Sequence, residues 1–120
     1  MKSFIKVVLL ILLCAFNVRA EHVVTLTWNP SPTVTVTGYQ VFRGLMSGGE
    51  GSTPINAAPV ASGCTNTQTC TYQDTSVEPG QTYFYYVESY DGTNFSVPSN
   101  EISLTVPVSP VQGLTIIQSN

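Results

Sequence analysis

Few side chains in this sequence could perform acid–base or nucleophilic chemistry, and they form no recognisable group. His22 is the only histidine among the 120 residues. The seven acidic residues fall singly in different segments, so only folding could bring together the two carboxylates that a glycosidase needs. Serines are plentiful, but no Gly-x-Ser-x-Gly nucleophile turn and no second histidine accompany them. The sequence therefore predicts a protein that is not an enzyme.

The sequence also lacks a ligand set for a metal or a cofactor. Calcium requires several convergent oxygens, and no Asp-x-Asp-x-Asp run supplies them. A zinc site would need histidine or cysteine ligands in addition to Cys64 and Cys70. Residues 48–51 are rich in glycine but lack the Lys-Ser/Thr that follows in a phosphate-binding loop. We predict no metal and no cofactor.

Residues 1–20 have the pattern of a secretory signal peptide. Two lysines lie within the first six residues, residues 7–16 are apolar, and small residues precede a cleavage point after Ala20. The apolar run is about half the length that spans a bilayer, so a retained membrane anchor is disfavoured. Cys14 raises the alternative of a lipoprotein, but such a signal requires a small residue where Leu13 stands. We predict a secreted, periplasmic or cell-surface protein.

Removal of the signal peptide changes the charge of the chain. Arg43 becomes the only basic residue against seven acidic residues, which is one positive charge against seven negative charges, or a net charge of −6. Such a chain has almost nothing to neutralise phosphates. Nucleic acids and anionic membranes are therefore poor candidate partners.

The cysteine count agrees with export. Loss of Cys14 leaves the even pair Cys64 and Cys70, which we predict to form a disulfide in an oxidising compartment. The bridge would close a small polar loop and contribute about 2 kcal/mol to stability.

The elements that would position any site are short strands between turns. The clearest is residues 81–90, where aromatic and β-branched residues lie between Glu78-Pro79-Gly80 and Asp91-Gly92. With a period of two, Tyr83, Tyr85, Val87 and Ser89 share one face, while Phe84, Tyr86, Glu88 and Tyr90 share a wetter one. Further predicted strands are residues 23–28, 38–43, 69–74 and 101–106, with at most a short edge strand in 52–61. No helical periodicity appears after residue 20, so the prediction is an all-β sandwich.

Five segments in this order resemble the fibronectin type III domain, particularly its bacterial secreted members. They are Val24-Thr25-Leu26-Thr27-Trp28, Gly38-Tyr39-Gln40-Val41-Phe42-Arg43, Tyr72-Gln73-Asp74-Thr75-Ser76-Val77, Pro79-Gly80-Gln81-Thr82-Tyr83 and Ser96-Val97-Pro98-Ser99-Asn100-Glu101. The resemblance implies an immunoglobulin-like two-sheet β-sandwich over residues 21–107, followed by a tail of residues 108–120. It also implies structural roles for four aromatic residues. Trp28 would fill the core against Tyr39 and Tyr85, and Tyr83 would be the tyrosine corner, with its hydroxyl bonded to the backbone near residues 77–79.

The resemblance has one departure, at the first strand. Members of the family begin with a strand ahead of the tryptophan strand, and here only Glu21 and His22 follow the signal peptide. An edge is therefore missing. The apolar group in residues 111–120 could occupy that edge in its own chain or in a neighbouring chain, or the tail could be a frayed terminus.

In this architecture the connection of residues 29–37 and the loop of residues 91–95 emerge at the same end. They would present two valines, an aromatic ring and two polar side chains: Val34, Val36, Phe95, Asp91 and Asn94. We therefore expect a non-catalytic interaction module that binds a protein or a carbohydrate there. The alternative is a structural subunit that self-associates through open sheet edges.

Overall fold

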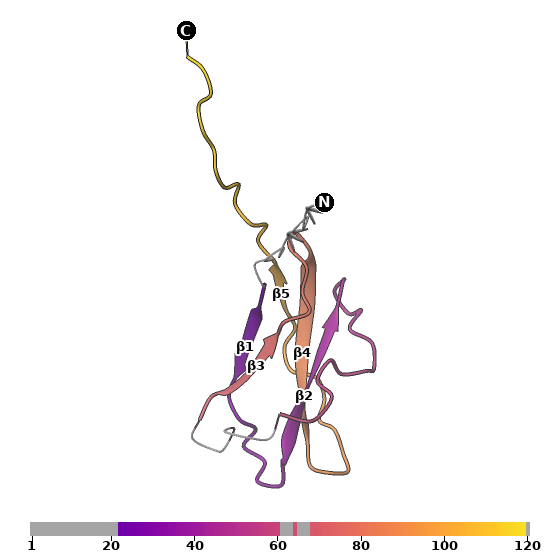
Figure 1. Cartoon of the computed structure of the whole chain (residues 1–120). Helices are drawn as coiled ribbons and strands as arrows, with labels where there is room; N and C mark the ends of the chain where they lie inside the picture. Colours follow the sequence, from indigo (N-terminus) through magenta and orange to yellow (C-terminus); the bar gives the residue numbers. More distant parts are fainter. Residues whose placement is uncertain (1–21, 61–63, 65–67, 120) are drawn as a thin grey trace, which may run out of the picture.

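The computed structural model describes residues 22–60, 64 and 68–119, which form five strands and no helix. The strands are β1 (Val24–Trp28), β2 (Gly38–Gly44), β3 (Cys70–Asp74), β4 (Thr82–Tyr90) and β5 (Ile102–Thr105). β1 and β3 form one sheet, and β2, β4 and β5 form a second with β4 in the centre (Figure 1). All pairings are antiparallel. The predicted all-β architecture with two sheets is confirmed, while the predicted signal peptide lies outside the described residues.

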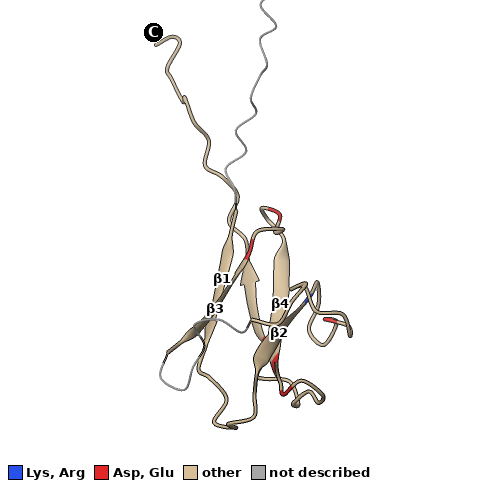
Figure 2. Ribbon diagram, turned by 60° about the horizontal axis from the view of Figure 1, so that its bottom comes forward, with Lys and Arg blue, Asp and Glu red and all other residues tan. Residues whose placement is uncertain are grey.

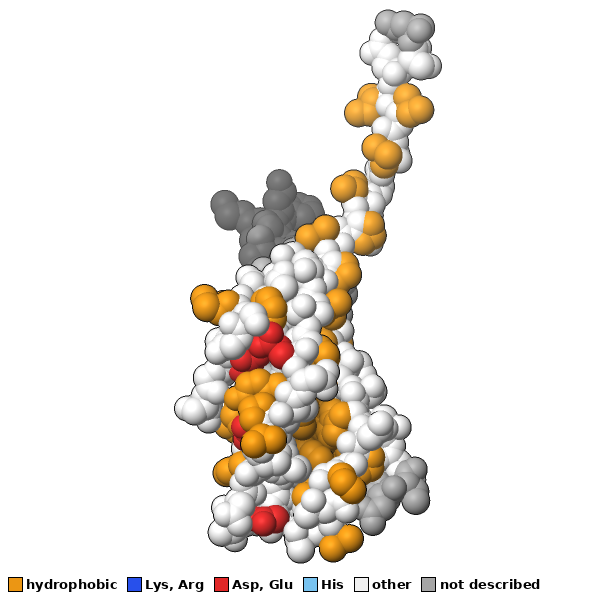
Figure 3. Space-filling model, turned by 180° about the vertical axis from the view of Figure 1, so that it is seen from behind, with side chains coloured by type: hydrophobic (Ala, Val, Ile, Leu, Met, Phe, Trp, Pro, Cys, Tyr) orange, Lys and Arg blue, Asp and Glu red, His pale blue; other side chains and the backbone are white. Residues whose placement is uncertain are grey.

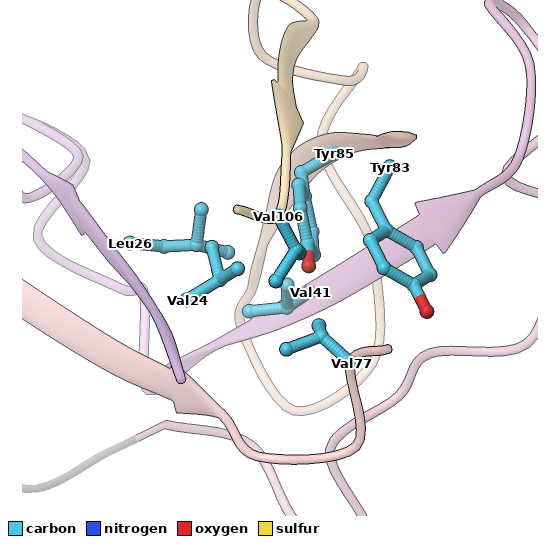
Figure 4. Close-up of a cluster of buried hydrophobic side chains, with 7 residues drawn as sticks. All are labelled: Val24, Leu26, Val41, Val77, Tyr83, Tyr85 and Val106. Atoms are coloured by element: carbon cyan, nitrogen blue, oxygen red, sulfur yellow. The ribbon is translucent and has the colours of Figure 1, made fainter. Parts of the chain in front are cut away.

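The core lies between the two sheets and is built by alternation along the strands. In β1, Val24 and Leu26 are buried while Thr25 and Thr27 are exposed, as expected for a strand with one dry face. Figure 4 shows the resulting cluster, in which side chains from both sheets and from the adjoining turns point toward one another. Its members are Val24, Leu26, Val41, Val77, Tyr83, Tyr85 and Val106.

Tyr83 fixes the turn that leads into β4. The backbone amide of Glu78 donates a hydrogen bond to the Tyr83 hydroxyl over 3.0 Å. This is the contact that the resemblance implied for that residue. Gly80 completes the turn with φ of 79°, a conformation that residues with a Cβ rarely adopt.

An ion pair connects the two sheets. Arg43 of β2 donates to Asp74 at the end of β3 over 2.8 Å, and the Tyr85 hydroxyl of β4 donates to the same carboxylate oxygen over 2.8 Å. Burial alone would raise the pKa of Asp74, but the hydrogen bonds from Arg43, Tyr85 and Ser76 outweigh burial and hold that pKa below its ordinary value. Charged residues are otherwise sparse over the sandwich (Figure 2).

A segment without regular strand structure covers the outer edge of β2. The backbone amides of Ile55 and Val60 donate to the carbonyls of Val41 and Tyr39, each over 2.8 Å. Between them the Asn56 side chain accepts from the Val41 amide over 2.8 Å and donates to the Tyr39 carbonyl over 3.1 Å. The edge strand considered for residues 52–61 does not form within residues 52–60. A side-chain amide occupies its place, because Pro54 and Pro59 cannot donate to a ladder.

The edge of β1 that faces away from β3 carries no strand among the described residues. Trp28 at the end of β1 is partly buried and packs against the core cluster, and its ring contacts Tyr39 edge-on at 5.6 Å between centroids. The described part of the tail, residues 108–119, has no strand structure and runs away from the sandwich (Figures 1 and 2). The tail therefore does not complete the edge of its own chain.

Candidate functional site

The connection of residues 29–37 and the loop of residues 91–95 meet at one end of the sandwich. The Thr37 amide donates to the Tyr90 carbonyl over 2.8 Å, which joins the end of the connection to the end of β4. The two segments enclose a hollow of about 190 Å³. Its lining residues are Thr33, Thr35, Val36, Ser89, Asp91, Asn94, Phe95 and Ser96.

Asp91 organises its loop by accepting hydrogen bonds from the backbone. Its Oδ1 accepts from the amides of Asn94 over 2.6 Å and Thr93 over 2.9 Å. These bonds favour the carboxylate form, so they lower the pKa of Asp91. Gly92 takes φ of 97° at the tip, which suits glycine. The loop therefore presents a carboxylate at neutral pH in a fixed geometry.

Phe95 is the aromatic wall of this hollow. Its ring stacks on Tyr90 with centroids 4.7 Å apart and planes inclined by 21°, yet 51% of the residue remains exposed. The ring is thus held in place from one side and open on the other. Phe95 also borders a second hollow of about 220 Å³, so the two hollows adjoin at this side chain.

The second hollow lies on the wetter face of β2 and β4. Its other lining residues are Gln40, Phe42, Gly51, Ser52, Tyr86 and Glu88. Phe42 and Tyr86 face each other in the register and stack with centroids 4.8 Å apart. The Tyr86 hydroxyl donates to the Gly51 carbonyl over 3.1 Å, which anchors the glycine-rich loop to the sheet. Gln40 and Glu88 are the next pair of opposed residues on this face of the sheet. Burial raises the pKa of Glu88.

An acid pair holds the glycine-rich loop at its other end. Glu101 accepts from the Ser47 hydroxyl over 2.7 Å and from the Gly48 amide over 2.8 Å. Glu50 is only 6% exposed, and burial together with a hydrogen bond to Glu101 raises its pKa. Glu101 accepts this hydrogen bond, which favours its carboxylate form and lowers its pKa. The pair therefore holds a proton on Glu50 more tightly than an isolated carboxylate would.

The structure brings together four of the five residues that the sequence analysis named for binding. Val36, Asp91, Asn94 and Phe95 line the first hollow, whereas Val34 is 85% exposed and is not among the lining residues. Apart from Phe95, the residues of the second hollow were not foreseen as binding residues. The signal for two of them was present, because the period-two pattern had placed Tyr86 and Glu88 on the wetter face of the central strand.

The remaining residues singled out from the sequence have structural positions. Cys64 and Cys70 form the predicted disulfide pair, with Cα atoms 4.8 Å apart. Tyr39, Tyr83 and Tyr85 are each at most 5% exposed. These side chains stabilise the sandwich and lie outside both hollows.

Neither the family models nor the curated sequences that were compared match this chain. Within the described residues, no three His, Cys, Asp or Glu side chains gather as metal ligands would. The same part of the chain has no helix with the length and apolar character needed to cross a membrane. The two hollows offer an aromatic ring, carboxylates, amides and hydroxyls, which are groups that can contact a ligand.

Proposed function

We propose that this protein is a secreted or cell-surface interaction module with a fibronectin type III-like fold, which binds an uncharged glycan at the two hollows around Phe95. The observation that carries the proposal is the half-exposed Phe95 ring, which stacks on Tyr90 and forms a wall common to both hollows. An exposed aromatic face packs well against the apolar face of a sugar ring.

The polar groups around Phe95 complement sugar hydroxyls. Asp91 and Glu88 carry carboxylates that accept from hydroxyl groups, and Gln40 and Asn94 have amides that both donate and accept. No basic residue lines either hollow, so a sulfated, phosphorylated or otherwise acidic ligand would meet negative charge without compensation. An uncharged glycan is the ligand class that this combination favours over an acidic one.

The proposed immunoglobulin-like fold and the exported location have separate support. The pairing of β1 with β3 and of β2 with β4 and β5, together with the Tyr83 contact to Glu78, agrees with the fibronectin type III arrangement. The Cys64–Cys70 disulfide and the amino-terminal pattern agree with export. A protein ligand is the competing possibility at the same site, and the test below separates the two.

The test is binding of the exported, oxidised protein to an array of neutral and acidic glycans, followed by calorimetry on any glycan retained. Phe95→Ala should weaken binding at least about tenfold, because it removes the stacking face. Val34→Ala is the matched control at the same end of the sandwich, and it should leave affinity unchanged. Circular dichroism and thermal melting would establish that both variants are folded.

Two results would refute the proposal. One is binding of acidic glycans in preference to neutral ones. The other is equal loss of binding in the Phe95 and Val34 variants, which would mean that the hollows are not the contact surface. Retention of no glycan, with capture of a purified protein that Phe95→Ala abolishes, would assign the same surface to a protein ligand instead.

A further inference from the structure

The side of the sandwich next to the open edge of β1 is an uncharged cleft. Two hollows, of about 90 and 350 Å³, lie along it and share Trp28, Val87, Ser99 and Asn100. Leu26, Tyr85 and Ile102 add apolar surface to the smaller hollow. Neither hollow has a charged lining residue. The cleft is therefore suited to an uncharged occupant, with apolar contacts in the smaller hollow and polar groups such as Asn29 and Ser31 in the larger one.

Beside the cleft lie hydrogen-bonding groups that the described residues leave unpaired. The Trp28 Nε1 group is buried and has no hydrogen-bond partner among the described residues. A buried indole N–H usually finds an acceptor, and leaving it unpaired costs free energy. The backbone edge of β1 beside it likewise faces no strand within the described part of the chain. The open backbone edge calls for the carbonyl and amide groups of an added strand.

The tail has the properties of such a strand. Residues 107–120 contain no charged residue. Leu114, Ile116 and Ile117 are each at least 86% exposed, and Figure 3 shows hydrophobic side chains along the whole described tail as well as in a hollow of the sandwich. Leu114 and Ile116 would share one face of a strand, with Thr115 and Ile117 on the other.

The tail is placed to leave its own chain. The Ser109 hydroxyl lies 3.3 Å from His22 Nε2, so the tail begins beside the residue that precedes β1. From there it extends outward and away from the strands (Figure 1). Pro107 and Pro110, which each lack an amide donor, lie where it departs.

We propose that residues 111–117 of one copy add as a strand along β1 of a second copy and cover the uncharged cleft there. This inference goes beyond the binding function proposed above, because it uses neither Phe95 nor the hollows around it. The tail and the cleft are different surfaces. The contact therefore closes as a dimer when two copies exchange tails, and otherwise extends into a chain of copies.

The experiment is size-exclusion chromatography with light scattering on the exported, oxidised protein over a range of concentrations, beside a variant that ends at Pro107. The intact protein should form dimers or larger assemblies and the truncated one should be a folded monomer. Leu114→Asp and Ile116→Asp should each weaken assembly at least about 100-fold, because they place a carboxylate in the cleft. Ile117→Asp adds the same charge on the opposite face and should weaken it far less.

Trp28→Phe tests the other partner. It keeps an aromatic ring in the cleft but removes part of the indole surface together with the N–H, so it should weaken assembly about fivefold while the protein stays folded. Three results would overturn the proposal. The first is an intact protein that is monomeric at all soluble concentrations. The second is a truncated protein that assembles equally well. The third is an equal effect of Ile116→Asp and Ile117→Asp, which would indicate non-specific apolar contact. Glycan binding is measured on the truncated monomer, so its failure would bear on the Phe95 site and not on assembly.

Discussion

Replacement of Asp74 by asparagine should cost more stability than any other single polar substitution in the described chain. Asp74 is 2% exposed and accepts from three residues. Its Oδ2 accepts from Arg43 and from the Tyr85 hydroxyl, each over 2.8 Å, and its Oδ1 accepts from the Ser76 amide over 3.1 Å and hydroxyl over 2.9 Å. In the variant an amide N–H₂ group replaces one carboxylate oxygen, so the groups that donate to that oxygen in the wild-type protein would face another donor.

The expected size of the effect follows from these contacts. A hydrogen bond to a charged group contributes roughly 1.5–3 kcal/mol, and the substitution weakens two of them, toward Arg43 and Tyr85. Two features reduce the sum. The Arg43 side chain is 23% exposed and can turn to water, and the Tyr85 hydroxyl can rotate to accept. We therefore expect a loss of about 2–4 kcal/mol in the free energy of unfolding.

The assay is urea unfolding followed by tryptophan fluorescence at several pH values. Because the pKa of Asp74 is lowered in the folded state, its carboxylate stabilises the fold above its ordinary pKa of 3.8, and this contribution is lost as pH falls below that value. The acid-induced loss should be smaller in Asp74→Asn. Glu78→Gln, which changes an exposed carboxyl, is the control. A loss below about 1 kcal/mol, or an unchanged acid limb, would refute the account of Asp74 as the link between the sheets.

Three further outcomes follow from other contacts. Replacing Cys64 and Cys70 by serine should lower the free energy of unfolding by about 2 kcal/mol, measured in urea against the same protein under oxidising conditions. Asn56→Ala should cost about 2 kcal/mol in the same assay, because it leaves the buried Val41 amide without an acceptor. The raised pKa of the Glu50 carboxyl makes the stability of the wild-type protein fall as pH rises above the ordinary value of 4.5. Glu50→Gln should therefore flatten the pH dependence of stability in that range. An unchanged slope would exclude Glu50 as the titrating group.

The strands were predictable because their alternation is strong. The five predicted segments match β1 to β5 within one residue at each end, since Val, Tyr and Thr at a period of two leave little ambiguity. The meeting of residues 29–37 with residues 91–95 was also foreseen, but only through the resemblance. Composition and periodicity alone do not say which loops share an end of a sandwich.

The contacts that could not be predicted depend on pairing between distant segments. The Arg43 link to Asp74 spans two sheets, and no local pattern connects residues 31 positions apart. Asn56 replaces a strand by bonding to β2, which the broken pattern around Pro54 and Pro59 concealed. The acid pair of Glu50 and Glu101 is 51 positions apart and arises only when the glycine-rich loop folds over the sheet.

The segment between the Phe95 loop and β5 explains how the two proposed surfaces can coexist on one small domain. Ser96 and Ser99 accept from the amides of Ser89 and Val87 through their side-chain oxygens, each over 2.9 Å, while their own amides donate back to the same two residues. The hydroxyls supply the acceptors that a regular ladder would have provided where Pro98 interrupts it. The segment is therefore fixed along β4 without being a strand. The small side chains of Ser96 and Ser99 leave room for the uncharged cleft on one side of this segment. At the beginning of the segment, Phe95 is held against Tyr90 beside the proposed glycan site.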